Sequence, residues 1–391
     1  MDTSRPTAIF QPKAGRDWTV TIALPGSWTL NAKKPDHKTM QAGRIARAAA
    51  VFCVDEIVVY DDDPSTVDPN VVSERYLRQG RGKKSKQEIL DSILEEDELW
   101  QNPDQFLYHL LSFAECPPHL RYDREQPELS LFKEHQNLRW TGCLPSMDMP
   151  HHLRSHEWCQ YREGVIVGPA PSAPSTKPSK KAKSPHPPAY ASIKCGLPHP
   201  IRVPIPPDSA IEPGMRTTIR FANATPPPSW PHLSPAQCAA LDATACPPSL
   251  PREQAGYYWG YSVRRAPSLS AVFSECEYAG GYDYTIGTSE RGVPVHSILP
   301  GAAAQPGTAA KAPAAFRHLL LVFGGVAGIE PAVANDAVLV AKGLGKASAH
   351  ELFDAWVNLV PGQGSRTIRT EEAVEFGLCA MKPWIDGMGE R

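Results

Sequence analysis

The sequence predicts an α/β protein whose parallel-sheet domain is split by an inserted all-β domain. Three observations favour this class. Residues 19–60 read as an apolar strand, a helix with one apolar face and a second apolar strand. Short β-like runs separated by proline-rich turns follow residue 145, and strand and helix patterns alternate again after residue 264. Because a β-α-β unit crosses over into a parallel sheet, the two outer regions are expected to form one domain.

The N-terminal part of this domain is expected at residues 18–145, after a disordered leader at 1–17. It should contain two strands with a helix between them, then a solvated helix and a more buried one. The expected ranges are 19–24, 39–52 and 57–60 for the β-α-β unit, 87 onward for the solvated helix, and 105–114 for the buried helix.

The insert is expected at residues 146–264 as a small, OB-like β-barrel. Its β-like runs are 164–168, 201–205, 216–221 and 257–263. Two tracts within it, 169–188 and 225–251, are rich in proline, and the sequence predicts exposed loops or disorder there.

The C-terminal part, residues 265–391, is expected to complete the sheet. The α/β pattern resumes at 269–273 and 282–286, and a linker leads to a strand at 317–323. An apolar element at 353–359 follows. Thr370, with Glu371 and Glu372 after it, is typical of a helix N-terminus with acids in its first turn.

Composition limits the function classes. The chain has 391 residues, of which 41 are proline, and 40 basic residues nearly balance 42 acidic ones. Net charge therefore neither supports nor excludes a nucleic-acid partner. Nine cysteines without a CxxC pair, and an N-terminus without a signal-peptide pattern, favour free thiols in the cytosol or nucleus. No apolar run reaches membrane-spanning length.

Three glycine-bearing loops follow apolar runs, at 287–292, 324–330 and 361–364. Ligands of open α/β sheets bind where loops leave the carboxyl ends of strands, although such loops also serve simply to turn the chain. None of the three is a GxGxxG fingerprint and no Walker A lysine follows, so nicotinamide and ATP sites have no support.

The sequence resembles a family of RNA methyltransferases of eukaryotes and archaea in the SPOUT, or α/β-knot, class. The segments that carry the resemblance are PGQGSRTIRTEEAV at 361–374, DYTIGTSERG at 283–292, LLVFGG at 320–325 and IALPGS at 22–27, with VDEIVVY at 54–60 and YYWGY at 257–261. They occur in the family's order across most of residues 18–60 and 256–380.

The resemblance implies a trefoil-knot fold and a bound S-adenosyl-L-methionine, which leaves as S-adenosyl-L-homocysteine. The positions that match the family's cofactor loops are Gly324, Gly325, Asn358, Leu359, Gly362, Gly364, Ser365, Thr367 and Ile368. Spacing and periodicity by themselves indicate no knot.

Three side chains are candidates for catalysis. Glu290 and Arg291 stand in one glycine loop, and Arg47 lies on the first helix. Methyl transfer to nitrogen or oxygen needs positioning and loss of a proton, for which a base or a polarising group is useful. An arginine can hold a phosphate, orient a base or form an ordinary surface salt bridge; with the resemblance, Arg291 is the preferred functional side chain.

RNA contacts are expected from Arg366 near the cofactor loops and from Arg252, Tyr258 and Arg264 in the insert. Aromatic and arginine side chains on a small barrel can stack bases and follow a phosphate backbone, although aromatic strands are more often core. Lysines at 83–86 and 177–183 add phosphate affinity, act as a nuclear-import signal or are solvated.

A metal site is not expected. His152, His156 and Cys159 would share one face of a helix, but Pro150 precedes them and no second ligand pair has finger-like spacing. A polar linker is the favoured interpretation of residues 151–159.

The resemblance implies an S-adenosylmethionine-dependent enzyme that methylates RNA as a homodimer, with ribosomal RNA as the first candidate substrate and uridine as a candidate base. We expect the protein in the nucleus or nucleolus and also in the cytoplasm. Two alternatives stay open: a protein methyltransferase of the same class, and a non-catalytic nuclear RNA-binding or scaffold protein. The target RNA, base and atom, and the general base, are left undetermined.

Overall fold

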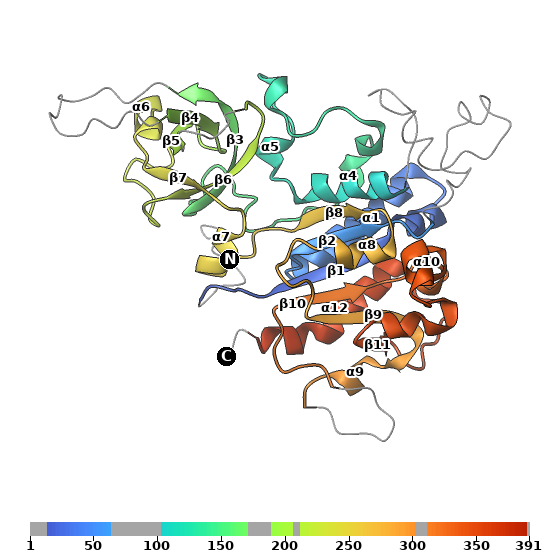
Figure 1. Cartoon of the computed structure of the whole chain (residues 1–391). Coiled ribbons are helices and arrows are strands. Elements are labelled where there is room, and N and C mark those ends of the chain that lie inside the picture. Colours follow the sequence, from blue (N-terminus) through green and yellow to red (C-terminus); the bar gives the residue numbers. More distant parts are fainter. Residues whose placement is uncertain (1–13, 64–102, 171–188, 206–211, 302–310, 389–391) are drawn as a thin grey trace, which may run out of the picture. The chain divides into compact units, whose positions relative to one another are not determined.

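The computed structural model describes residues 14–63, 103–170, 189–205, 212–301 and 311–388. Backbone contacts divide the chain into two compact units (Figure 1). One comprises Asp17–Glu115, Glu134–Met147 and Gly260–Arg391; the other comprises Cys116–Lys133 and Asp148–Trp259, with the N-terminal residues up to Arg16.

The first unit is built on a parallel sheet of six strands in the order β11-β9-β10-β1-β2-β8. Their bounds are Thr19–Pro25 (β1), Glu56–Tyr60 (β2), Ser262–Ala266 (β8), Tyr284–Pro294 (β9), His318–Val322 (β10) and Ala355–Asn358 (β11). In the centre, Ile22 of β1 aligns with Leu321 of β10 and Ile57 of β2. The α/β class and the parallel sheet expected from the sequence are confirmed.

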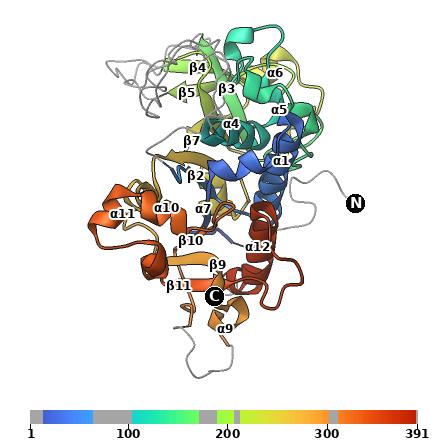
Figure 2. The same cartoon turned by 90° about the vertical axis from the view of Figure 1, so that its right-hand side faces the viewer.

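Helices cover both faces of this sheet, as Figure 2 shows. On one face α1 (Pro35–Val51) lies beside α12 (Thr370–Asp386), and Arg44 of α1 bonds Glu375 of α12 through two nitrogens. The other face packs against α8 (Leu269–Ser274), α10 (Glu330–Asn335), α11 (Ala337–Ala341) and the 3-10 helix η5 (Lys346–Leu352). Both faces of the central strands are therefore buried, which explains why these strands read as continuous apolar runs.

The helix α4 (Pro103–Glu115) packs against α1 and against β2 and β8, and its residues Phe106, Leu107, Leu110 and Leu111 are buried. The buried helix expected at 105–114 is therefore confirmed. The remaining elements of this unit are short: η1 (Gly26–Asn31), η3 (Gln136–Leu138), η4 (Thr141–Cys143) and α9 (Val295–Ile298). Among the described residues no helix is both long enough and apolar enough to cross a membrane.

The second unit contains a five-stranded antiparallel sheet in the order β5-β4-β3-β6-β7. The strands are β3 (Tyr161–Ala170), β4 (Ala189–Lys194), β5 (Ile201–Ile205), β6 (Arg216–Phe221) and β7 (Ala243–Cys246), with α5 (Pro118–Arg121), η2 (Pro127–Leu129), α6 (Pro235–Ala239) and α7 (Leu250–Ala255) around them. The terminal strands β5 and β7 also contact each other, so the sheet is nearly closed. Residues such as Ile193, Val203 and Ile219 point into its core.

Two expectations for the insert are wrong. The run 257–263 is not a strand of the antiparallel sheet: residues from Ser262 onward form β8, which pairs in parallel with β2 at the edge of the other sheet. The tract 225–251 is not loop or disorder throughout, because it contains α6, β7 and α7, and Cys238 and Ala243 are buried in the core. Its prolines lie in turns or at first helical positions, where they cost no backbone hydrogen bond.

Contacts also place residues 116–133 with the antiparallel sheet, whereas the sequence assigned them to the N-terminal α/β part. Residues 14–17 of the expected disordered leader at 1–17 are ordered: the N–H of Arg16 donates to the carbonyl of Arg252 (2.9 Å). The rest of the leader, the solvated helix from residue 87, the lysines at 83–86 and 177–183, and most of the proline-rich tract 169–188 lie outside the described residues.

Candidate functional site

The turn after β10 is closed by its own backbone. Gly328 adopts a left-handed conformation (φ +84°) and its N–H donates to the carbonyl of Gly325 (3.1 Å). A Cβ on Gly324 would lie 2.3 Å from the carbonyl carbon of Gly328, closer than any real side chain can approach. Glycine at position 324 is therefore required for the turn to form.

Three neighbouring elements hold this turn in place. The hydroxyl of Thr370, at the start of α12, donates to the Gly324 carbonyl (2.9 Å). The buried Tyr60 hydroxyl donates to the carbonyl of Phe323 (2.8 Å), and Thr288 donates to that of Val322 (3.1 Å). The carboxyl ends of β2, β9 and β10 thus meet the first residue of α12 at one place, as expected for a ligand site in an open α/β sheet.

The loop after β11 is joined to β9. The Asn358 side chain donates to the carbonyl of Glu290 (2.8 Å) and accepts from the N–H of Val360 (3.0 Å). Gly362 has φ +74°, which favours glycine, and space is open where a Cβ on Gly364 would stand. Leu359 turns inward toward Gly377 of α12, whereas Ser365 and Thr367 are exposed and Ile368 is half-buried.

Arg291 and Glu290 lie in a bulge of β9. The pairing of β11 with β9 passes from Gly287 directly to Val293, so residues 288–292 leave the ladder. Arg291 projects with 74% of its side chain exposed and lies 3.7 Å from the carboxylate of Glu330, which is only 14% exposed. Glu290 contributes its backbone carbonyl to Asn358, and its side chain is exposed.

Residues 287–292, expected as a loop after a strand, are thus part of β9 and its bulge. Most of the residues expected at the site are still brought together, because this bulge and the loops after β10 and β11 share one edge of the sheet. Arg47 is the exception: its guanidinium donates to the carbonyl of Met147 (2.7 Å), and this bond ties α1 to the segment before the insert.

Two of the side chains expected to bind RNA are not available to it: one is hydrogen-bonded within the protein and the other is buried. Arg264 stands in β8 of the parallel sheet, not in the insert, and its guanidinium bonds Glu56 (3.0 Å) and the carbonyl of Val272 (3.0 Å). The pKa of Arg264 is raised although burial lowers it, because Glu56 and Tyr282 favour the charged form. Tyr258 is 4% exposed, so its ring cannot stack on a base without rearrangement.

The other two keep partial or full exposure. Arg252 donates to the carbonyl of Arg16 (2.8 Å) and approaches Glu253 (3.3 Å). Arg366 is exposed in the loop after β11. The sequence could not separate these cases, since it misplaced residues 260–264 and did not reveal the partners of Arg264.

A carboxylate that sequence reasoning overlooked lies beside the β10 turn. Asp62, just after β2, accepts a hydrogen bond from the Ser27 hydroxyl (2.5 Å), and a Cβ on Gly325 would lie 3.3 Å from the Ser27 oxygen and 3.5 Å from that of Asp62. Burial raises the pKa of Asp62, although Ser27 opposes the shift. The available signal was its position: an acidic residue at the carboxyl end of a central parallel strand.

The first histidine of the segment 151–159 is packed in the protein interior. His151 is fully buried, with its ring 4.5 Å from that of His152 and 5.8 Å from that of Trp259. Burial raises the pKa of the Cys159 thiol to about 11, so this thiol is protonated at neutral pH. Within the described part of the chain, no group of three or more His, Cys, Asp or Glu side chains is placed to hold a metal ion.

Comparison with known proteins identifies the family. The family model described as "Putative RNA methyltransferase" matches residues 19–381. A human 28S rRNA (uridine-N(3))-methyltransferase is 37% identical over 96% of this chain and 81% of its own length. A Drosophila melanogaster protein of the same name is 37% identical over 93% of this chain and 62% of its own length.

The likeness extends to archaea. An uncharacterized protein of Haloarcula marismortui is 26% identical over 93% of this chain and 98% of its own length. The family match spans both outer α/β regions and the insert between them, and it includes all three glycine-bearing loops. The expected enzyme class is therefore confirmed: the chain belongs to this family of RNA methyltransferases.

Proposed function

We propose that the protein transfers a methyl group from S-adenosyl-L-methionine to N3 of a uridine in large-subunit ribosomal RNA. The observation that carries the proposal is the meeting of the β9 bulge with the turn after β10 and the loop after β11, joined by the Asn358–Glu290 and Thr370–Gly324 hydrogen bonds. The names of the human and Drosophila relatives supply the uridine, its N3 atom and the RNA.

The residues at these loops fit the donor. Gly325 and Gly364 have no side chain to keep a ligand from the backbone, and space is open beside Gly364. Asn358, Gly362, Ser365, Thr367 and Ile368 would border the donor, with Leu359 and Gly324 fixing the shape of its cradle. When bound, the donor supplies a methyl group on a sulfonium, which is ready for in-line displacement.

The chain's own contribution is to place the uracil and to accept its N3 proton. Arg291 is exposed at the site and would orient RNA through a phosphate or a base carbonyl. Two carboxyls at this edge, Glu290 and Asp62, are the candidates for accepting the proton. Asp62 is the one held beside Gly325, by its hydrogen bond from Ser27.

The protein has a knotted fold and assembles with a second copy of itself. The chain after β11 passes into α12 through a trefoil knot, which the resemblance to the SPOUT class supports. The protein acts as a homodimer with the cofactor loops near the subunit interface, and the resemblance to the SPOUT class supports this assembly. It works in the nucleus or nucleolus, with some in the cytoplasm; a ribosomal RNA substrate and nine cysteines without a CxxC pair support this location.

The nearly closed antiparallel sheet acts as an OB-like grip for RNA. Its support is the pair of half-buried residues Tyr190 and Arg202 on adjacent strands β4 and β5, with the guanidinium 4.6 Å from the ring centre. Aromatic rings paired with arginine suit stacking on single-stranded bases.

Two experiments test the proposal. Calorimetric titration with S-adenosylmethionine should show binding, which a non-catalytic scaffold that has lost its cofactor site would not. Transfer of labelled methyl groups should then favour total RNA over total protein, with the label in 3-methyluridine after digestion. Label in protein alone would establish the protein-methyltransferase alternative instead.

A further inference from the structure

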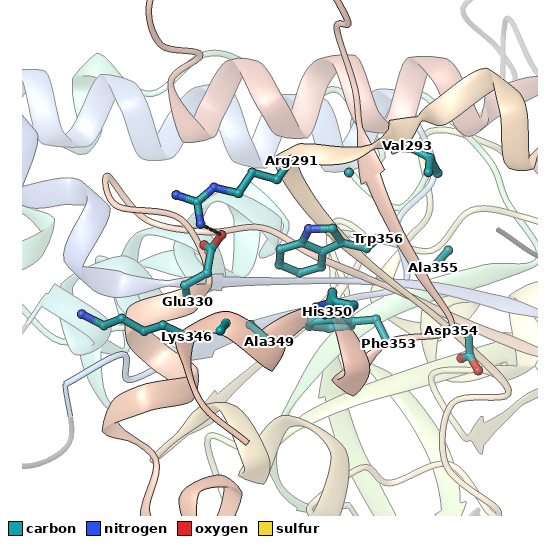
Figure 3. A pocket seen from close by; sticks show the side chains of 12 residues that line it. Arg291, Val293, Glu330, Lys346, Ala349, His350, Phe353, Asp354, Ala355 and Trp356 are labelled. Atoms are coloured by element: carbon teal, nitrogen blue, oxygen red, sulfur yellow. Dashed lines mark ion pairs between the residues drawn. The ribbon is translucent and has the colours of Figure 1, made fainter. Parts of the chain in front are cut away.

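A pocket of about 600 Å³ lies on the parallel-sheet unit beside the proposed donor loops (Figure 3). Its walls come from the second half of β9, from β11, from η5 with the two residues that follow it, and from the first residue of α10. The volume is within the range of small-molecule sites. None of the residues expected to bind the donor lines this pocket; of the expected site residues only Arg291 does.

One wall of the pocket is aromatic and rigid. Trp356 is half-buried, and its ring stacks on that of Phe353 at 5.5 Å with an interplanar angle of 29°. On the strand side the indole meets the backbone of β9 so closely that a Cβ on Gly287 would lie 2.5 Å from its Cε3. An indole fixed in this way loses little entropy when a planar ring packs against it.

The charged groups around the aromatic wall differ in how firmly each is held by partners within the protein. The Asp354 carboxylate is occupied by the N–H and hydroxyl of Thr285, both at 2.8 Å. Glu330 is paired with Arg291, but at 3.7 Å and with Arg291 largely exposed, so a phosphate can compete for that guanidinium. Lys346 is exposed at the rim, where Figure 3 shows its amine pointing away from the aromatic wall.

The pocket is connected to the turn after β10 through Glu330. A Cβ on Gly328 would lie 2.3 Å from a carboxylate oxygen of Glu330, so this side chain packs directly on the turn that Gly325 and Gly328 close. A ligand in the pocket would therefore be separated from the proposed donor cradle by a single side-chain layer.

We propose that this pocket binds one nucleotide of the RNA, with its base against Trp356 and its phosphates at Arg291 and Lys346. The inference rests on the proposed function, since it takes the ligand to be the RNA that the enzyme methylates. A nucleoside could also come from the donor's adenosine, but two cations at the pocket favour a ligand that carries phosphate.

The test compares two ligands on the full-length protein. The probes are a fluorescently labelled single-stranded oligoribonucleotide of mixed sequence, about ten nucleotides long, measured by anisotropy, and S-adenosylhomocysteine, measured by calorimetry. Trp356→Ala should bind the oligoribonucleotide about tenfold more weakly, because one stacked base is lost. Its affinity for S-adenosylhomocysteine should equal that of the wild type.

Three further variants keep the result interpretable. Trp356→Phe retains a stacking face and should bind within about threefold of the wild type. Lys346→Ala, at an exposed position that cannot unfold the protein, should reduce the slope of log affinity against log salt by about 0.7. Trp140→Ala removes an indole that is 41% exposed and does not line the pocket, and should leave both affinities unchanged.

Unchanged RNA affinity in Trp356→Ala together with an unchanged salt slope in Lys346→Ala would overturn the inference. Loss of S-adenosylhomocysteine binding in Trp356→Ala, with RNA binding intact, would assign the pocket to the donor instead. Failure of the proposed function would look different, because the wild type itself would then bind no S-adenosylhomocysteine and transfer no methyl group.

Discussion

The turn after β10 and the loop after β11 are both rich in glycine, but the glycines meet different surroundings. At Gly324 an added Cβ would collide with the backbone of Gly328 at 2.3 Å. At Gly364 an added Cβ would meet nothing within 4 Å. In the first case the missing side chain makes room for the chain's own fold, and in the second it leaves a surface that another molecule can approach. Glycine content alone therefore does not identify a binding loop.

The largest effect is expected from Gly324→Ala. Because the added carbon would overlap backbone and not a flexible side chain, the turn must open and the bonds from Thr370 and Tyr60 must be strained or lost. We expect a loss of about 3 kcal/mol in the free energy of unfolding. Urea denaturation measures this free energy. Wild-type stability in the variant would show that the turn after β10 can accept a side chain at position 324 and is not rigid.

Gly364→Val should leave the stability of the fold almost unchanged and weaken binding of the methyl donor. The free energy of unfolding should stay within about 0.5 kcal/mol of the wild type, because the side chain enters open space. Affinity for S-adenosylmethionine should fall at least about a hundredfold, or about 2.7 kcal/mol, since the valine occupies the approach to the backbone. Calorimetry on the folded variant gives the affinity.

The matched control for Gly364→Val is Gly142→Val, at another glycine with nothing within 4 Å of an added Cβ and no left-handed conformation. It should change neither stability nor affinity. Donor binding equal to that of the wild type in Gly364→Val would remove the loop after β11 from the site.

The difference between the two glycines was not visible in the sequence. Apolar runs at 19–24, 57–60 and 317–323 predicted the central strands, because a strand buried on both faces must be apolar along its whole length. The order of strands at an edge is a tertiary property. Residues 257–263 resembled the neighbouring β-runs, and only the pairing with β2 places β8 in the parallel sheet.

The candidate site, like the fold, could be predicted from the sequence only in part. The resemblance to the SPOUT class named Gly324, Asn358 and Arg291 as site residues, and the general rule that ligands bind at the carboxyl ends of parallel strands agreed with it. Partners between distant segments could not be predicted. Arg264 bonds Glu56, 208 residues away, and Asp62 pairs with Ser27. Such contacts between distant segments cannot be read from local sequence. Arg264 was therefore wrongly predicted to bind RNA, and Asp62 was not predicted as a site residue.

Asn358→Ala tests how far the loop after β11 depends on the bulge of β9. The substitution removes the donor to the Glu290 carbonyl and the acceptor for the Val360 N–H. Both bonds lie near the surface, so the free energy of unfolding should fall by about 1 kcal/mol. Donor affinity should fall also, because the loop loses its fixed position. Asn358→Asp keeps the acceptor and should retain part of both; equal affinity in all three proteins would mean that the loop is held by its backbone alone.

The smallest effect, and the one that addresses the rigid turn most directly, is the pH dependence of Asp62→Asn. Asp62 lies beside Gly325 with a pKa raised from its ordinary value of 3.8 by burial, and Asp61 and Asp63 add to the shift. A carboxyl whose pKa is higher in the folded state favours folding most when it is protonated. Its contribution therefore declines as the pH rises from the unfolded pKa through the folded one.

Asparagine does not titrate, so the stability of Asp62→Asn relative to the wild type should improve as the pH rises from about 4 through that window. At low pH the variant should be the less stable protein, by less than about 1 kcal/mol, if the amide accepts the Ser27 hydrogen bond less well. Urea titrations of both proteins at several pH values measure the difference. A stability difference that does not change with pH would mean that the pKa of Asp62 is the same in the folded and the unfolded chain. Asp62 would then no longer be the preferred candidate for accepting the N3 proton.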